Sequence, residues 1–87
     1  MDKPDLYVVA RFLEALWIKG GGEMRRQELQ MAVRVNYNLF VKYLGFLKNR
    51  GLVNETEDGI VKITAKGADA YSTLVRFVKE VVNGELF

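Results

Sequence analysis

Residues 35–53, VNYNLFVKYLGFLKNRGLV, are the stretch that decides the fold. Apolar residues recur in it at helical spacing: Phe40, Leu44 and Leu47. This spacing predicts a helix over residues 37–49 with one face turned inward. Gly51 follows at the position after a helix end where a positive φ is normally needed. The stretch therefore predicts a helix that ends at residue 49 and is followed closely by a strand.

A second helix is predicted immediately before this one, over residues 26–33. Its inward residues are Leu29, Ala32 and Val33. The turn that joins the two helices lies at residues 35–36, so that residues 26–50 form a helix-turn-helix.

A further helix is predicted within residues 1–18, starting near Pro4, whose missing N–H costs nothing in a first turn. Its apolar residues span an arc of about 200°, which is wider than a surface helix requires. Gly20–Gly22 end it, because three glycines in a row do not hold a helix. Residues 23–25 then form a very short strand or lead into the next helix.

The C-terminal half changes its period. Two β-branched runs within residues 52–63 flank Asp58-Gly59, a dipeptide typical of hairpins. Thr64 is a good N-cap for a last helix over residues 65–82, whose apolar arc spans about 180°. The predicted fold class is α+β, mostly α: helix, helix, helix, β-hairpin, helix.

Two short sequence patterns make this order of elements similar to that of a known family. Tyr43 to Val53 has an aromatic-Leu-x-x-Leu run closed by Arg-Gly-Leu-Val, and residues 63–67 read Ile-Thr-Ala-Lys-Gly. Together they resemble the end of the recognition helix and the exit of the wing in winged helix-turn-helix proteins. The chain is similar to small archaeal DNA-binding proteins and regulators of that fold, including the "ten-a" chromatin class, and shares its core pattern with MarR-like and PadR-like regulators. The resemblance implies DNA binding and, as in some of these proteins, pairing through a C-terminal dimerisation helix.

Composition restricts the possible chemistry. The chain of 87 residues is expected to form one winged-helix domain over residues 1–87. It has no Cys and no His, which excludes disulfides, Cys/His metal sites and His-based catalysis. We therefore expect no enzyme activity, no metal, no cofactor and no small-molecule ligand. No signal peptide or apolar run long enough for a membrane span is visible, so we expect a cytoplasmic, nucleoid-associated protein.

The positive charge lies in one segment. Residues 25–50 have six Lys or Arg and one Glu, a net charge of +5, whereas the whole chain has +2. Local concentration of positive charge attracts a polyanion. The predicted partner is double-stranded DNA, with helix 37–49 in the major groove.

The expected contacts follow from this docking. Asn, Tyr and Lys side chains at the start of helix 37–49 can reach base edges, Leu39 can meet a thymine methyl group, and cations around the motif can reach phosphates. The predicted DNA-binding residues are Arg25, Arg26, Arg34, Asn36, Tyr37, Asn38, Leu39, Lys42, Tyr43 and Lys62. At Arg26, a phosphate could also rest on free N–H groups. Tyr43 could instead belong to the core, and Asn36 could serve as the helix N-cap.

The wing departs from the strongest DNA-binding version of the fold. Glu55, Glu57 and Asp58 are expected to make its tip acidic, and phosphate would repel such a tip. Lys62 is the one cation between the ends of the wing strands. We therefore expect the wing to touch the backbone near Lys62 or to stand off the DNA.

The terminal helices have more apolar surface than one small core needs, which predicts a homodimer. The predicted interface residues are Phe12, Trp17, Tyr71, Leu74, Val75, Val78, Val81 and Val82. The favoured function is a sequence-specific, dimeric transcriptional regulator. Two alternatives stay open: a general DNA-packing chromatin protein, and a winged-helix protein-interaction module in a larger assembly.

Overall fold

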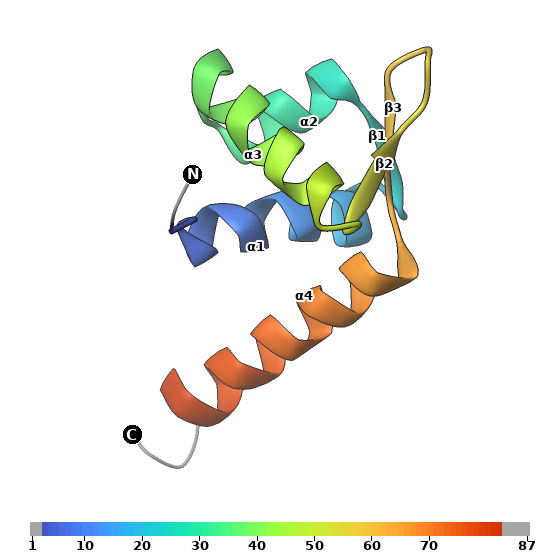
Figure 1. The fold of residues 1–87 in the computed structure, drawn as a ribbon. Coiled ribbons are helices and arrows are strands. Elements are labelled where there is room, and N and C mark those ends of the chain that lie inside the picture. The colour runs from blue at the N-terminus through green and yellow to red at the C-terminus, as the bar shows by residue number, and fades with distance from the viewer. Residues whose placement is uncertain (1–2, 83–87) are drawn as a thin grey trace.

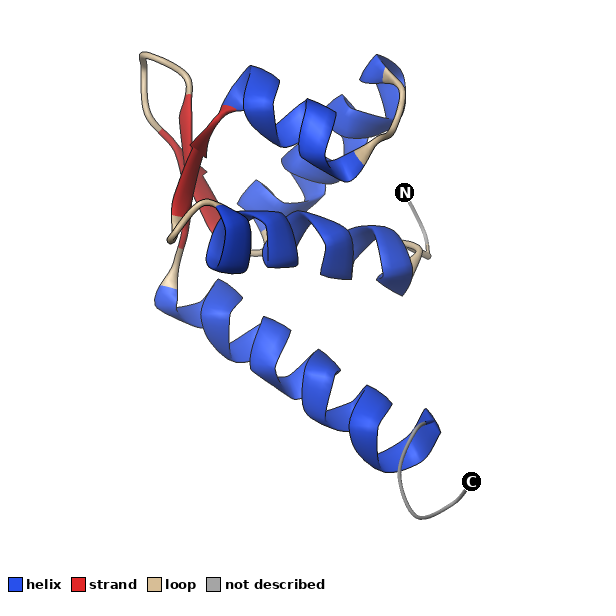
Figure 2. Ribbon diagram, turned by 180° about the vertical axis from the view of Figure 1, so that it is seen from behind, coloured by secondary structure: helices blue, strands red, loops and turns tan. Residues whose placement is uncertain are grey.

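The computed structural model describes residues 3–82, apart from the side chain of Val82. Helices dominate it, and a small antiparallel sheet stands at one end (Figures 1 and 2). The elements in chain order are α1 (Leu6–Glu14), the π-helical turn η1 (Ala15–Lys19), β1 (Glu23–Arg25), α2 (Arg26–Val33), α3 (Tyr37–Asn49), β2 (Val53–Glu55), β3 (Ile60–Ile63), α4 (Ala65–Phe77) and the π-helical turn η2 (Val78–Val82). The expected mostly helical winged-helix class is confirmed.

Side-chain caps fix where α1 and α3 begin. Asp5 accepts the Tyr7 N–H at 2.8 Å and begins α1. Pro4 therefore precedes the cap. The sequence had suggested that Pro4 lies in the first helical turn, and the structure places it outside the helix. Asn36 accepts the Leu39 N–H at 2.9 Å and begins α3. Each cap satisfies an N–H group that the helix itself leaves unpaired.

The sheet has three strands in the order β1-β3-β2, all antiparallel. In this register, Glu23 lies opposite Lys62, and Glu55 lies opposite Val61. Residues 23–25 thus form a true strand, which fixes the start of α2 against the wing. Gly59 has a φ of 82° in the hairpin turn, which explains the Asp-Gly pair there.

The core lies between α1, α2, α3 and the sheet. Phe12 and Phe40 are completely buried and stack with ring centroids 5.5 Å apart. Aliphatic residues from every surrounding element close around them: Leu13, Leu16, Leu29, Val33, Leu44, Leu47, Val53 and Val61. Burial of this apolar surface is the main stabilising contribution to such a fold, and it holds α3 rigidly against α1.

The two sequence patterns of the family are in direct contact with each other. The Thr64 hydroxyl donates to the Gly51 carbonyl at 2.7 Å and accepts the Gly67 N–H at 3.0 Å. A Cβ added at Gly67 would lie 2.1 Å from the Leu52 carbonyl oxygen. Only glycine therefore lets the first turn of α4 reach the end of α3. This junction determines the direction in which α4 leaves the domain.

The last helix starts below the sheet, runs back beneath α1 and diverges from it, so that its C-terminal end extends away from the rest of the molecule (Figure 1). Its inner side chains, Ala70, Tyr71 and Leu74, pack against the core and are only partly buried. The described chain is accordingly elongated, with extents of 45 × 25 × 22 Å. Among residues 3–82, no helix has the length and apolar character needed to cross a membrane.

Candidate nucleic-acid interface

One face of α3 points away from the core and presents polar, cationic and small residues. Its exposed side chains are Tyr37, Asn38, Val41, Lys42, Lys48 and Asn49. No residue of α3 is acidic. Tyr37 is 59% exposed, so its hydroxyl is available to a ligand. The face can therefore offer hydrogen bonds and positive charge to a polyanion.

Tyr43 does not belong to this face. Its side chain is only 6% exposed, its ring lies 6.1 Å from that of Phe12, and its hydroxyl accepts the Asp5 N–H at 2.8 Å. The prediction that Tyr43 contacts DNA is wrong, because its side chain fixes the start of α1 against α3. Leu39 is half-buried against the core, and its surface is correspondingly reduced. Asn36 remains exposed, but its side-chain oxygen is occupied by the N-cap bond.

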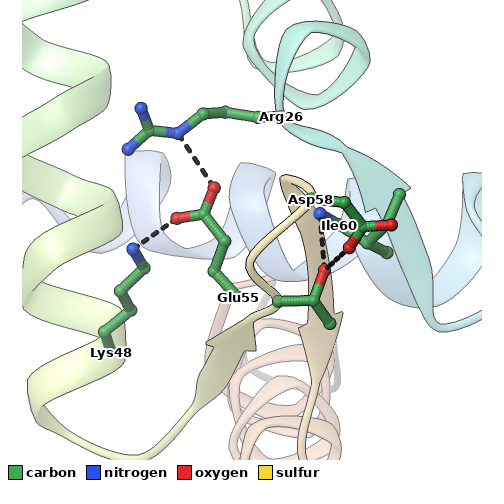
Figure 3. A network of polar contacts seen from close by, with 6 residues as sticks. Arg26, Lys48, Glu55, Asp58 and Ile60 are labelled. Carbon is green, nitrogen blue, oxygen red and sulfur yellow. Dashed lines mark hydrogen bonds and ion pairs between the residues drawn. The ribbon is translucent and has the colours of Figure 1, made fainter.

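Arg26 is held on two sides. Its guanidinium lies 5.8 Å from the centroid of the Phe40 ring, and its Nε lies 3.1 Å from Glu55 Oε2. The other Glu55 oxygen binds the ammonium of Lys48 (Figure 3). One carboxylate from the wing thus joins the first residue of α2 to the last turn of α3. The backbone N–H of Arg26 donates to the Gly59 carbonyl at 2.9 Å. This N–H group is therefore not free to bind a phosphate, contrary to the expectation from the sequence.

This arrangement removes Glu55, but not Glu57 and Asp58, from the expected acidic tip of the wing. The Glu55 side chain is only 13% exposed and faces α2 and α3, not solvent. Its charge is neutralised, and it also consumes part of the positive charge of the helix-turn-helix. Glu57 and Asp58 alone remain exposed at the hairpin turn. The Thr56 hydroxyl donates to Asp58 and, with the carboxylate's own backbone N–H, lowers the pKa of that carboxyl below its usual value.

The remaining predicted phosphate contacts are dispersed around α3. Arg25 is exposed at the junction of β1 and α2. Arg34 is exposed in the turn before α3, with a φ of 56°, and its carbonyl accepts a long 3.5 Å bond from Arg11. Lys62 lies on β3, half exposed, with its Nζ 3.9 Å from Glu23. Arg25 and Arg34 are thus well exposed cations, whereas Lys62 shares its charge with a cross-strand carboxylate.

Sequence reasoning missed three residues of the exposed α3 face: Val41, Gly45 and Asn49. Val41 is 40% exposed and Asn49 is also exposed. Both line an open hollow of about 640 Å³ on this face, together with Gly45. Their spacing of four residues could have placed them on the same face as Asn38 and Lys42.

The predicted dimer residues divide into three groups. Phe12 is completely buried in the core, so the prediction that it lies at an interface is wrong. Tyr71, Leu74 and Val75 are half-buried on α4, with the Tyr71 hydroxyl 3.5 Å from Glu14. Burial and then the Glu14 charge raise the pKa of Tyr71 above its usual value. The side chain of Val82 lies outside the described residues.

The third group is exposed. Trp17 is 45%, Val78 is 43% and Val81 is 38% exposed, and Phe77 beside them is 58% exposed. A groove of about 420 Å³ runs between α1 and α4, with a largely apolar lining. Its walls include Tyr7, Ala10, Tyr71, Leu74, Val75 and Val78. Among residues 3–81, large apolar side chains along the outer half of α4 and η2 therefore have no partner in the single chain.

An exposed helix, preceded by a short helix across its start and followed by a hairpin, defines the helix-turn-helix class with a wing. The family model of the winged helix-turn-helix matches residues 6–81, nearly the whole chain. The chain belongs to the winged helix-turn-helix family, and this membership points to DNA binding. No curated protein matches the chain.

Proposed function

We propose that this protein is a small, dimeric, non-enzymatic transcriptional regulator that binds double-stranded DNA sequence-specifically. The observation that carries the proposal is the exposed face of α3, which combines Asn38 and Lys42 with an absence of acidic residues on the helix. The major groove admits one α-helix, and the recognition helix of this motif enters it. Helix α3 is the recognition helix in this proposal.

Base reading is assigned to Tyr37 and Asn38, and phosphate binding on the same face is assigned to Lys42. An amide can pair with both the N6 and the N7 of adenine, whereas an ammonium beside it can bind a backbone phosphate of any sequence. Tyr37 can hydrogen-bond a base edge or a phosphate through its hydroxyl. Asn36 stands at the same end of α3 and contributes through its backbone and its amide nitrogen. Leu39 adds an apolar edge to this contact surface.

Phosphate binding is assigned to the cations that flank α3. Arg25 and Arg34 are exposed at the two ends of α2. We assign each of them to a backbone phosphate beside the major groove. Arg26 reaches the DNA with the part of its guanidinium that Glu55 does not occupy. Lys62 serves the same purpose from the wing. Such contacts set register and affinity, whereas base contacts set specificity.

A second copy of the chain is the proposed occupant of the α1–α4 groove. Val78, which is exposed on the wall of this groove, supports this, as do exposed Val81 further along the helical segment and Trp17, which lines a separate hollow with Tyr71 and Val75. Large apolar residues rarely remain exposed together in a monomer. The helical segment 65–82 is about 27 Å long, enough to pair along its length with its symmetry mate. A two-fold dimer would present two α3 helices to the two halves of a palindromic site. The archaeal "ten-a" likeness agrees with this way of pairing.

The experiment that tests DNA binding is a titration of a labelled duplex over a salt series. If the flanking cations neutralise several phosphates, log affinity falls linearly with log salt, with a slope of about −0.9 per phosphate. Binding that is unchanged by salt, or absent at low salt, contradicts the proposal. Selection from a random duplex pool then separates a regulator from a packing protein, because a packing protein enriches no motif.

A further inference from the structure

Gly45 occupies the middle of the exposed face of α3, and nothing in the part of the chain that the structure describes requires a glycine there. A Cβ added at Gly45 would meet no atom within 4 Å. The other glycines that the structure describes each have a backbone reason: Gly21, Gly22, Gly51 and Gly59 have positive φ values, and a Cβ at Gly20 or Gly67 would collide with a carbonyl oxygen. Gly45 alone among them has neither reason.

This glycine also has a cost to the fold. It stands inside a continuous helix of 13 residues, where glycine is among the least favourable residues and alanine the most favourable. Folding alone would therefore favour alanine at residue 45. A residue that weakens its own helix, without any packing reason, indicates a requirement imposed from outside the chain.

The surroundings of Gly45 define that requirement. Residues three and four positions away share its face: Val41, Lys42, Lys48 and Asn49. The open hollow of about 640 Å³ extends over Gly45, between Val41, Lys42 and Asn49. Lys42 and Arg50 line this hollow and no described carboxylate does, whereas the Lys48 ammonium on the same face is bound to Glu55. The positive charge around this hollow therefore fits a polyanion better than it fits a protein surface that is cationic or has few acidic residues.

We propose that Gly45 is the point where duplex DNA approaches α3 most closely, with base-pair edges against the helix backbone. The proposal rests on the DNA-binding function given above and adds a depth and a register to it. A helix with its side chains is about as wide as the major groove, so a missing side chain at the centre of the face lets the helix axis sit deeper. Val41 and Asn49 then contact bases on either side of Gly45, and recognition extends beyond the first two turns of α3.

The test uses two variants that enlarge residue 45 without harming the helix, Gly45→Ala and Gly45→Leu. Both residues are strong helix formers, so the melting temperature rises by about 4–8 °C for alanine in a domain of this size. Affinity for the duplex selected by the wild-type chain falls by roughly tenfold for alanine and further for leucine. Stability and binding thus move in opposite directions.

Thr73→Ala is the matched control. Thr73 is exposed on α4, on the side away from α1, and its replacement also improves helix propensity. We expect this variant to raise the melting temperature and to leave DNA affinity unchanged. A loss of DNA affinity in this control would mean that helix stabilisation alone weakens binding, and that would overturn the argument from Gly45.

The remaining outcomes are distinguishable. If the wild-type chain binds no duplex at low salt, the proposed function fails and this inference falls with it. If the wild-type chain binds and Gly45→Ala and Gly45→Leu bind equally well, the proposed function stands and the close approach at Gly45 is wrong. A lower melting temperature for Gly45→Ala would mean that the glycine serves the fold, which also overturns the inference.

Discussion

Replacing Glu55 by glutamine is expected to destabilise the protein and to strengthen its binding to DNA. Glu55 joins Arg26 and Lys48, whose side chains are 39% and 38% exposed, through a carboxylate that is 13% exposed. The three charges sum to +1 in the native protein and to +2 in Glu55→Gln. The substitution keeps the size of the side chain, so it changes charge with little change in packing.

The magnitudes follow from the exposure of the partners. Exposed ion pairs contribute about 0.2–1 kcal/mol each, and hydrogen bonds to charged groups contribute about 1.5–3 kcal/mol when better buried. With partly exposed partners, we take roughly 1–2 kcal/mol for the two pairs together. In a domain of this size, that loss lowers the melting temperature by about 5–15 °C.

The effect on DNA has the opposite sign. If the released charge neutralises one more phosphate, the slope of log affinity against log salt steepens by about 0.9. At 0.1 M salt, this increment corresponds to about eightfold tighter binding. The assay is a duplex titration at several salt concentrations, together with a thermal melt of the same preparations.

Glu57→Gln is the matched control for Glu55→Gln. It removes the same charge from the wing, but Glu57 is exposed and makes no ion pair with the described residues. We expect its melting temperature to stay within about 2 °C of the wild-type value, as for most surface substitutions. Weaker DNA binding by folded Glu55→Gln would refute the reasoning, because it would mean that Glu55 orients Arg26 for phosphate and does not compete with it.

Three further predictions concern the interface, the dimer and pH. Lys42→Ala should weaken binding to all sequences alike and reduce the salt slope by about 0.9. Asn38→Ala should instead cost about 1–3 kcal/mol of binding free energy at one base pair only. Equal losses of affinity on cognate and random duplexes for both variants would contradict this division. Val78→Glu places a charge in the apolar α1–α4 groove and should convert the dimer to a monomer in light scattering. Thr73→Glu, at an exposed residue on the opposite side of α4, should leave the dimer intact. A wild-type chain that is monomeric at tens of micromolar would contradict the proposed dimer. The pKa of Tyr71 is raised in the folded chain, so the unfolded chain loses the phenol proton first as the pH rises. The stability that this group contributes is complete below pH 10.0 and falls as the pH rises through the folded pKa. In urea titrations, Tyr71→Phe should abolish this alkaline fall in stability.

The predicted helix over residues 37–49 and the observed α3 agree because local chemistry decides both ends. Asn36 caps the start, and Gly51 takes a φ of 72° after the end. These interactions involve residues within a few positions of each other, so the order of residues contains them. The same holds for the Asp58-Gly59 turn and for Thr64 at the start of α4.

The direction of individual side chains could not be predicted in the same way. Tyr43 and Phe12 lie on apolar arcs too wide to tell core from surface, and only the packing of α1 across α3 buries both. Glu55 was expected to repel DNA from an exposed tip. Strand pairing turns it instead toward Arg26 and Lys48, which are 29 and 7 residues away in sequence.

The sequence was sufficient for the order of the helices and the hairpin, for the ends of α3, and for the concentration of positive charge in residues 25–50, since these depend on residue type and short-range spacing. Only the tertiary structure decided how much of that charge is free. It brings one wing carboxylate against two cations and leaves the glycine at residue 45 facing open space. The reason is physical: exposure and ion pairing depend on distances between elements far apart in the chain, and the burial of a common core sets those distances.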